Sequence, residues 1–330
     1  MTNESNAIDI VLPWVDGEDP RLKAERMKYM SERKDAHHED VAGNSRYTCI
    51  GEIKYCIASI NMFAPFIRKI FIVTDGQNPD LLPFLEKNFP QGHIPIEIVD
   101  HKVIFKGYEQ YLPVFNSRAI ETMIWKIPGL SERFILMNDD FVLTGHVKPE
   151  DFFRGDKTVC YGTHYPTLWA NMLGLFRRRL NGCKRISFKE SMIKAAEIMG
   201  RRHSFIYLGH TPRALRRSFY ESFFSDKDDI IERNLTHRFR HYDQYNSQEL
   251  FYISEFREGR CIVTPHKRKL LYLMPKKRPG YIDRKMKRLD RKTEAVFCCI
   301  NTLSLASERD QAKVLEWIEK KLGQNLQLPR

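Results

Sequence analysis

Four short apolar runs in the first half of the chain, each ending in acidic or amide residues, constrain the fold most strongly. The runs are rich in β-branched residues, and amphipathic segments separate them; in Glu52 to Phe63 the apolar residues recur every three or four positions, as in a helix. Strands that alternate with helices build a parallel, doubly wound sheet. We therefore predict an α/β fold whose strands come from residues 8–15, 67–74, 94–99 and 134–143.

The polar residues that follow the first two runs are candidates for ligand binding. In doubly wound sheets the ligand lies beyond the carboxyl ends of the strands. Trp14 would stack there on a base or a sugar, and Asp16 beside Gly17 would bind a hydroxyl group. Asp75 and Gln77 occupy the tip of the second run. A core tryptophan followed by an ordinary Asp-Gly turn explains the first group equally well.

The fourth run reads FILMNDDFVL and carries three polar residues, Asn138, Asp139 and Asp140, between apolar ones. Two adjacent carboxylates cannot be buried without a partner, because each unpaired charge would cost roughly several kcal/mol. Carboxylate oxygens at the edge of an α/β sheet suit Mg²⁺ or Mn²⁺ holding a diphosphate. A solvated turn between two strands accounts for the same residues, since Asn and Asp favour turns.

Asn116 and Ser117 stand at the expected N-cap of a helix that Pro128-Gly129 would end. A helix N-terminus attracts negative charge, so this one would bind phosphate if it lay beside the two aspartates. The alternative is a cap with a purely structural role.

The net charge of +12 belongs to the second half of the chain. Residues 1–150 contain 17 Lys and Arg against 22 Asp and Glu, whereas residues 151–330 contain 37 against 20. A positive field attracts nucleic acid, an anionic membrane or phosphorylated substrates. We do not expect nucleic acid, because the basic residues form no recognisable module with base-stacking aromatic residues. The dense basic stretch at 266–292 also contains apolar residues, so it could lie on anionic lipid.

The seven cysteines are odd in number and never spaced as CxxC, which favours reduced thiols and a cytosolic location. The acidic N-terminal segment lacks the features of a signal peptide, and we expect no membrane-spanning helix. The predicted location is therefore cytoplasmic, with any membrane association peripheral at the inner face.

The chain contains several long motifs: IDIVLPWVDGEDP, EIKYCIASINMFAPFIRKIFIVTDGQNPDLL, VDHKVIFKGYEQYLPVFNSRAIE, IPGLSERFILMNDDFVL, GHTPRAL with RFRH, and CINTL. In order and spacing these motifs resemble the conserved regions of the Stealth proteins, which are bacterial capsular polysaccharide phosphotransferases similar to GlcNAc-1-phosphotransferase. The resemblance covers residues 7–150 closely and 205–320 loosely.

The resemblance implies a Rossmann-like, GT-A-like sheet and transfer of a whole sugar-1-phosphate. The donor would be a UDP-sugar, and UMP would leave as an acceptor hydroxyl on an oligosaccharide or a lipid-linked saccharide attacks. It further implies a nucleotide-sugar-binding core with the metal site at 1–150, a helical insertion at 151–204, and a basic, mainly helical region at 205–330 that completes the active site.

The resemblance also assigns roles to individual residues. Asp139 and Asp140 would hold Mg²⁺ or Mn²⁺ with support from Asn138, His210 would be the general base, and Arg240 with Arg238 would neutralise phosphate. The donor would contact Trp14, Asp16, Gly17, Asp75, Gln77, Asn116, Ser117 and Glu121.

The chain departs from the family pattern at three places. Residues 46–50 lack the usual acidic or amide residues, Met123 and Trp125 replace histidines, and Thr302 replaces the acid of the CIND motif. A GT-A-type glycosyltransferase that releases UDP is the first rival function. A nucleic-acid-binding protein without activity is the second.

Overall fold

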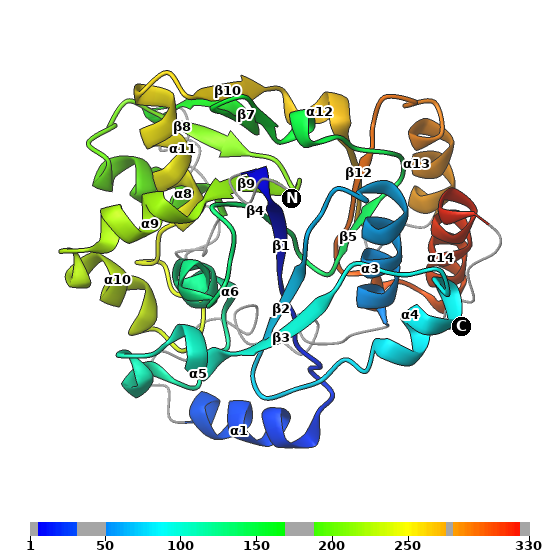
Figure 1. Ribbon diagram of the computed structural model, residues 1–330, viewed down its shortest axis with the longest axis horizontal. Helices are drawn as coiled ribbons and strands as arrows, with labels where there is room; N and C mark the ends of the chain where they lie inside the picture. Colours follow the sequence, from blue (N-terminus) through cyan, green and yellow to red (C-terminus); the bar gives the residue numbers. More distant parts are fainter. Residues whose placement is uncertain (1–5, 32–50, 169–187, 275–279, 324–330) are drawn as a thin grey trace.

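A five-stranded sheet forms the centre of the computed structural model, which describes residues 6–31, 51–168, 188–274 and 280–323. Its strand order is β3-β2-β1-β4-β9, and only the edge strand β9 runs antiparallel to its neighbour. The predicted α/β class with a largely parallel sheet is thus confirmed (Figure 1). The strands are β1 (Ile8–Pro13), β2 (Ile70–Thr74), β3 (Ile96–Asp100), β4 (Arg133–Leu136) and β9 (Arg213–Arg216).

Side chains of the central strands alternate between two apolar cores, one on each face of the sheet. In β1, Ile10 and Leu12 belong to one core and Val11 to the other. This alternation follows from the two-residue period of a strand, and a sheet buried on both faces therefore consists almost entirely of apolar residues.

Helices cover both faces of the sheet (Figure 1). On one face lie α3 (Glu52–Phe63), α4 (Leu82–Asn88), α13 (Tyr281–Leu289) and α14 (Glu308–Leu322). On the other lie α5 (His101–Ile104), α6 (Ser117–Met123), α8 (Phe188–Ile198), α9 (Arg217–Phe224), α10 (Asp228–Leu235) and α11 (Ser247–Arg257). Helix α1 (Pro20–Ser31) packs through Leu22 on a small separate cluster, and α12 (His266–Lys269) follows the strand at Cys261–Thr264.

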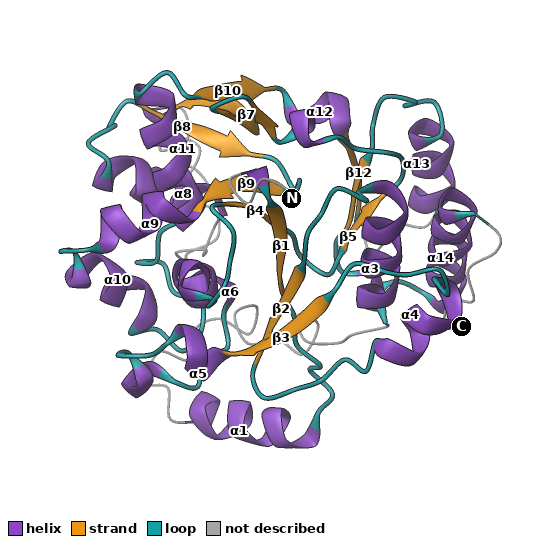
Figure 2. Ribbon diagram, viewed as in Figure 1, coloured by secondary structure: helices purple, strands orange, loops and turns teal. Residues whose placement is uncertain are grey.

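Two further sheets come mainly from the second half of the chain (Figure 2). One contains β6 (Phe153–Arg154), β7 (Lys157–Pro166), β8 (Ser204–Leu208) and β10 (Cys261–Thr264). The other contains β5 (Phe141–Leu143), β11 (Leu270–Leu273) and β12 (Phe297–Ile300), in the order β11-β12-β5.

The segment expected as a helical insertion at 151–204 differs from that expectation. Its described part includes β6 and β7 as well as α8. Thr158 to Tyr161 are buried residues of types that favour strands, and they pair with β10. Residues 169–187, with the three arginines at 177–179, lie outside the described residues. The boundaries proposed for the three regions remain a prediction.

The NDD stretch does not form one continuous strand. Its first part is β4 of the central sheet, and its last part is β5, which pairs with β12 in another sheet. Asn138, Asp139 and Asp140 form the turn between them, where the backbone N–H of Phe141 donates to the carbonyl of Asn138 at 3.1 Å. The two aspartates consequently lie where the chain leaves the carboxyl end of β4.

Candidate functional site

A cavity of about 300 Å³ opens at the carboxyl ends of β1 and β4. The strand order places β2 on one side of β1 and β4 on the other, so this edge is the topological switch point of the sheet, where ligands bind in doubly wound folds. We call this cavity the acidic pocket. Its polar lining is Trp14, Glu52, Asp75, His101, Asn116, Ser117, Asn138, Asp139, Asp140, Arg240, Asn301, Thr302 and Ser304.

Carboxyl groups predominate among the ionisable residues that line the acidic pocket. Four carboxyl groups line it, from Glu52, Asp75, Asp139 and Asp140, against the single guanidinium of Arg240. Burial, followed by repulsion from Asp140 and Glu52, raises the pKa of Asp139 to about 8. Burial likewise raises the pKa of Asp140 to about 7, although a hydrogen bond from Cys299 opposes the shift. The two acids therefore lie in surroundings that disfavour their charged forms.

The donor set fits a hard divalent cation. Among the described residues, Oδ1 of Asp140 and Oδ2 of Asp75 are buried without a hydrogen-bond partner, whereas Oδ2 of Asp140 accepts from Cys299 Sγ at 3.6 Å. A cation beside the acids would lower both raised pKa values, because opposite charge favours the ionised form. Carboxylate oxygens are the ligands that Mg²⁺ and Mn²⁺ prefer. The assignment of Asp139 and Asp140 as ligands stays a prediction.

The opposite wall of the acidic pocket is built around the start of α6. Asn116 is its N-cap, as the sequence predicted: Oδ1 accepts from the N–H of Ala119 at 3.0 Å. The amide of Asn116 donates to the carbonyl of His237 at 2.7 Å, which ties α6 to the loop carrying Arg240. Nη2 of Arg240 in turn donates to Ser117 Oγ at 3.1 Å. Arg240 is thus held with its charge at the pocket.

Five residues predicted to bind substrate lie outside the lining of the acidic pocket. The side chain of Gln77 binds the loop after β1: its oxygen accepts from the N–H of Asp16 and its nitrogen donates to the carbonyl of Asp16, each at 2.9 Å. Gly17 belongs to that same loop. Glu121 accepts from Gln248 at 2.9 Å, and Arg238 donates to the carbonyl of Pro113 at 2.9 Å. These contacts position neighbouring segments, and direct binding by the five residues remains a prediction.

His210 lines a second cavity, of about 420 Å³. Its imidazole is stacked between Phe188 and Tyr272, with ring centroids 5.6 Å and 5.1 Å away. Burial and the nearby charges of Arg213 and His266 lower the pKa of His210 to about 4. The imidazole is therefore neutral at pH 7 and able to accept a proton, but its pKa lies well below the near-neutral value expected from the sequence.

A short series of contacts connects the two cavities. Asp140 accepts from Cys299, Cys299 is paired in register with Tyr272, and Tyr272 stacks on His210. Tyr272 lines the second cavity, and the charge of Asp140 contributes to raising the pKa of this tyrosine. The antiparallel pairing of β12 with β5 brings the turn with the two aspartates next to β11. The acid pair and the candidate base are thus linked through the neighbouring side chains of Cys299 and Tyr272.

The pocket contains Glu52 and His101, which the sequence did not single out, and Thr302, which was noted only as a departure from the CIND motif. Glu52 begins α3, directly after Gly51, whose φ of 81° favours glycine. His101 follows β3, and Thr302 adopts a φ of 59° within the CINTL motif. The position of His101 just after a predicted strand was the feature of the sequence from which its place in the pocket could have been predicted. Glu52 and Thr302 reach the pocket only because α3 and β12 pack beside β5.

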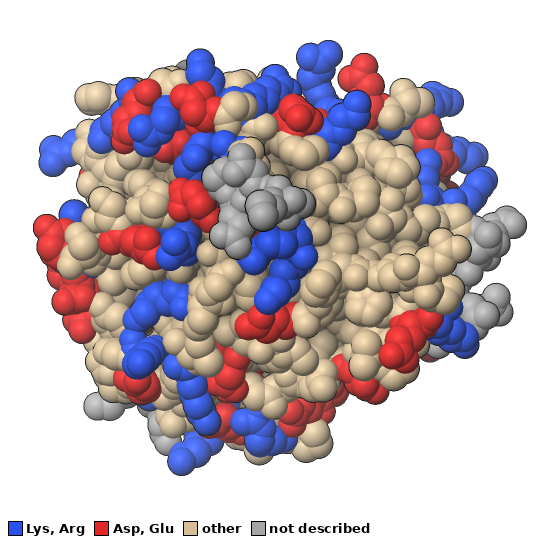
Figure 3. All heavy atoms as spheres, viewed as in Figure 1, with Lys and Arg blue, Asp and Glu red and all other residues tan. Residues whose placement is uncertain are grey.

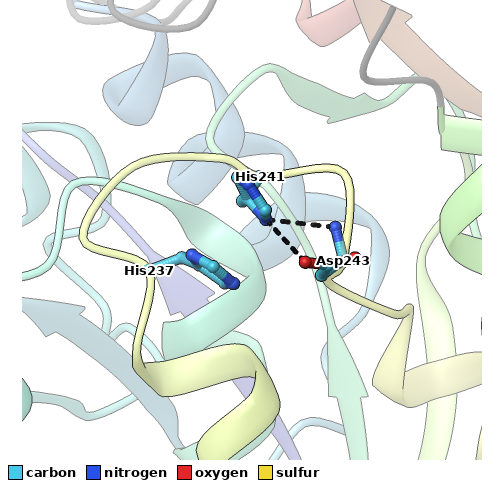
Figure 4. Close-up of side chains that lie close together, drawn as sticks. All are labelled: His237, His241 and Asp243. Carbon is cyan, nitrogen blue, oxygen red and sulfur yellow. Dashed lines mark hydrogen bonds and ion pairs between the residues drawn. The ribbon is translucent and has the colours of Figure 1, made fainter. Parts of the chain in front are cut away.

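Three side chains near Arg240 form a separate group that could hold a metal ion (Figure 4). His237, His241 and Asp243 each offer one ligand atom, and these atoms lie within 4.8 Å of one another. Nδ1 of His241 accepts from the N–H of Asp243 at 3.2 Å and lies 3.4 Å from its carboxylate. Two imidazoles and one carboxylate suit a softer cation than Mg²⁺.

The basic stretch at 266–292 forms α12, β11 and α13, while residues 275–279 lie outside the described residues, as do residues 46–50. Among the helices that the structure describes, none combines the length and the apolar character needed to cross a bilayer. Docking on a membrane and a cytoplasmic location remain predictions.

Comparisons with known proteins give consistent results. Residues 46–161 match the family model for conserved region 2 of Stealth proteins. An exopolysaccharide phosphotransferase of Streptomyces coelicolor is 32% identical over 91% of this chain, which spans 47% of that relative, about half its length. A receptor polysaccharide phosphotransferase of Streptococcus oralis is 30% identical over 71% of this chain and 74% of its own length.

A capsular polysaccharide phosphotransferase of Haemophilus influenzae is 32% identical over 80% of this chain and 70% of its own length. Among solved structures, the galactosyltransferase LgtC is similar with a TM-score of 0.48 at 12% identity, covering 98% of both chains. A structural likeness at that level carries no argument about chemistry.

Proposed function

Because the chain belongs to the Stealth family of polysaccharide phosphotransferases, we propose that it transfers a hexose-1-phosphate or N-acetylhexosamine-1-phosphate from a UDP-sugar to a saccharide hydroxyl. The product is a phosphodiester in a capsular or cell-wall polysaccharide, and UMP is released. The observation that carries the proposal is the acidic pocket, in which Asp139 and Asp140 lie at the switch point together with Arg240.

The donor occupies the acidic pocket with its diphosphate toward the two aspartates. Asp139 and Asp140 would hold a divalent cation, which would supply positive charge for the phosphoryl oxygens and for the leaving group. Arg240, anchored by Ser117, adds a fixed positive charge on the opposite wall. Trp14 lines this pocket, and its buried Nε1 has no partner among the described residues, which supports its assignment to the nucleotide or the sugar.

The acceptor hydroxyl attacks from the side of His210. Its oxygen forms a bond to the β-phosphorus, the bond from that phosphorus to the oxygen bridging the α-phosphate breaks, and UMP leaves with the electron pair. The hydroxyl proton passes to an imidazole nitrogen of His210, which is neutral at pH 7 because of its lowered pKa. Phe188 and Tyr272 hold the ring in place by stacking on its two faces.

The deciding experiment identifies the nucleotide that leaves. The purified protein is incubated with Mg²⁺, a panel of UDP-sugars and an oligosaccharide or lipid-linked acceptor, and products are resolved by chromatography and mass spectrometry. UMP, together with an acceptor that gains sugar and phosphate, is the expected result. UDP with an acceptor that gains only sugar would instead establish the glycosyltransferase alternative.

A further inference from the structure

Beside His210, basic residues gather around the second cavity. We call it the basic pocket. Its charged lining consists of Lys267 from α12, Lys285 and Arg288 from α13, and Lys292 just after α13. Among the described residues no carboxyl group lines it. A cavity of about 420 Å³ falls in the size range of small-molecule sites, and the described part of its lining contains four cationic side chains.

Helix α13 separates its charges between two sides. Lys285, Arg288 and Lys292 recur at helical spacing and line the basic pocket. The acids of the same segment point to α14 instead: Asp283 pairs with Lys313 at 2.5 Å, and Asp290 pairs with Lys321 at 3.2 Å. These two acids are therefore engaged with α14 and not with the pocket.

The remaining wall of the basic pocket is aromatic and apolar. Tyr207 and Tyr272 line it together with Leu270 and Leu289, and the imidazoles of His210 and His266 lie among them. Tyrosine rings offer flat apolar faces with a polar edge, which suits a sugar ring. The combination of cations and tyrosines matches a ligand that carries both a phosphate and a saccharide.

We propose that the basic pocket binds a phosphate group carried by the saccharide acceptor, so that the preferred acceptor of this enzyme is already phosphorylated. The proposal rests on the proposed function, and it specifies the acceptor class. A phosphodiester within the saccharide chain and a pyrophosphate joining the saccharide to a lipid share this chemistry, and we favour the phosphodiester. The product of one transfer contains such a group and could serve as the next acceptor.

The position of the pocket supports this assignment over a membrane contact. The four cations surround a cavity whose wall includes His210, the candidate base, so a phosphate bound there holds its saccharide beside the reacting hydroxyl. The phosphate charge would also oppose that of Arg213 and His266, which lower the pKa of His210. On the face that Figure 3 shows, lysines and arginines are interspersed with acids and form no broad basic patch.

The test compares two matched double variants. Lys267→Gln with Arg288→Gln removes two charges from the basic pocket. Arg284→Gln with Arg291→Gln removes the same charge from the same part of the chain, at exposed positions outside the lining. Binding of the methyl phosphodiester of an N-acetylhexosamine is measured by calorimetry or NMR, with the uncharged methyl glycoside as reference. This binding assay needs no turnover, so it remains informative even if the proposed function fails.

The pocket variant should bind the phosphodiester about 10- to 100-fold more weakly than wild type, since two charge-assisted contacts are lost, whereas the control variant should bind it like wild type. In turnover, the ratio of kcat/KM for the phosphorylated acceptor to that for the same unphosphorylated acceptor should fall by a similar factor. Equal affinity in wild type and pocket variant, or equal loss in both variants, would overturn the proposal.

Two further arms separate the sources of the phosphate. An acceptor joined through pyrophosphate to a short lipid should depend less on Lys267 and Arg288 than the phosphodiester acceptor does. If the pyrophosphate acceptor alone loses affinity in the pocket variant, the phosphodiester assignment is wrong. Vesicles containing anionic lipid are the last probe: binding to vesicles that requires the pocket residues, without preference for the phosphorylated saccharide, would replace the proposal with a membrane contact.

Discussion

The acidic pocket and the basic pocket have opposite charge and arise in different ways. The acids come from strand ends and their adjoining turns and helices, where the topology of the sheet gathers them at one edge. The cations come from segments near the C-terminal end that fold back over β11 and β12. Cys299 and its register partner Tyr272 connect the two pockets.

This difference suggests a division of labour. Under the proposed function the acidic pocket would bind the donor and stabilise the charge of the reaction, so changes there should reduce turnover whatever the acceptor. The basic pocket would bind the acceptor, so changes there should alter acceptor preference. Each prediction below would sharpen or break that division.

The largest effect is expected for Asp140→Asn, which removes a candidate metal ligand from the acidic pocket. We expect kcat/KM to fall by about 10³-fold or more with every acceptor. Without added metal the thermal midpoint should stay equal or rise, because an amide costs less to bury than the carboxylate of raised pKa. Steady-state kinetics and calorimetry measure the two quantities. Wild-type turnover in this variant would end the role of Asp140.

The next effect concerns Arg240, which Ser117 holds at the acidic pocket. Arg240→Gln should lower kcat/KM by about 10²- to 10³-fold, with kcat carrying most of the loss, since the charge acts on the phosphate in the transition state. Arg238→Lys is the matched control, because Arg238 contacts backbone carbonyls outside the pocket. An equal loss in both variants would mean that the loop as a whole, and not the Arg240 charge, matters.

His210→Gln should lower kcat by about 10²-fold, a typical share for a general base. Because burial lowers the pKa of His210, the wild-type rate with saturating Mg²⁺ should remain constant from pH 8 to about pH 5 and fall as the pH approaches 4, where the imidazole becomes protonated. This decrease in rate at acidic pH should be absent in His210→Gln. If the decrease persists in the variant, it belongs to the titration of another group.

The smallest effect is on stability. The folded-state pKa values of Asp139 and Asp140, about 8 and about 7, exceed the ordinary value of 3.8. From the ordinary value up to these raised values, the metal-free folded protein therefore binds more protons than the unfolded chain. The two aspartic acids stabilise the metal-free fold below pH 4, and this stabilisation is lost as the pH rises through 7 and 8. The metal-free thermal midpoint of wild type should therefore fall, relative to the Asp139→Asn, Asp140→Asn variant, as the pH rises from 4 to 8, and change little above pH 8.

Mg²⁺ should raise the wild-type midpoint more at pH 8 than at pH 6, because protons compete with the cation at lower pH. His241→Gln is the control for the separate histidine group and should keep this response to Mg²⁺. A response lost in His241→Gln and kept in Asp140→Asn would move the Mg²⁺ site to His237, His241 and Asp243.

Local sequence pattern determined much of the fold. The helix at Glu52 to Phe63 has the predicted bounds, and the four apolar runs supply the parallel strands, because periodicity and β-branched content act on neighbouring residues. Asn116 was recognisable as an N-cap for the same reason. The acid pair could be placed at a strand end from order alone.

Tertiary structure decided which of these residues meet. Pairing of β5 with β12 divides the NDD stretch between two sheets, and it brings Thr302 to the acidic pocket and Cys299 to Asp140. Folding of α13 against α14 turns its acids away and leaves Arg288 beside His210. Such contacts join residues far apart in the chain. They depend on long-range packing and charge pairing, which cannot be predicted from local sequence periodicity.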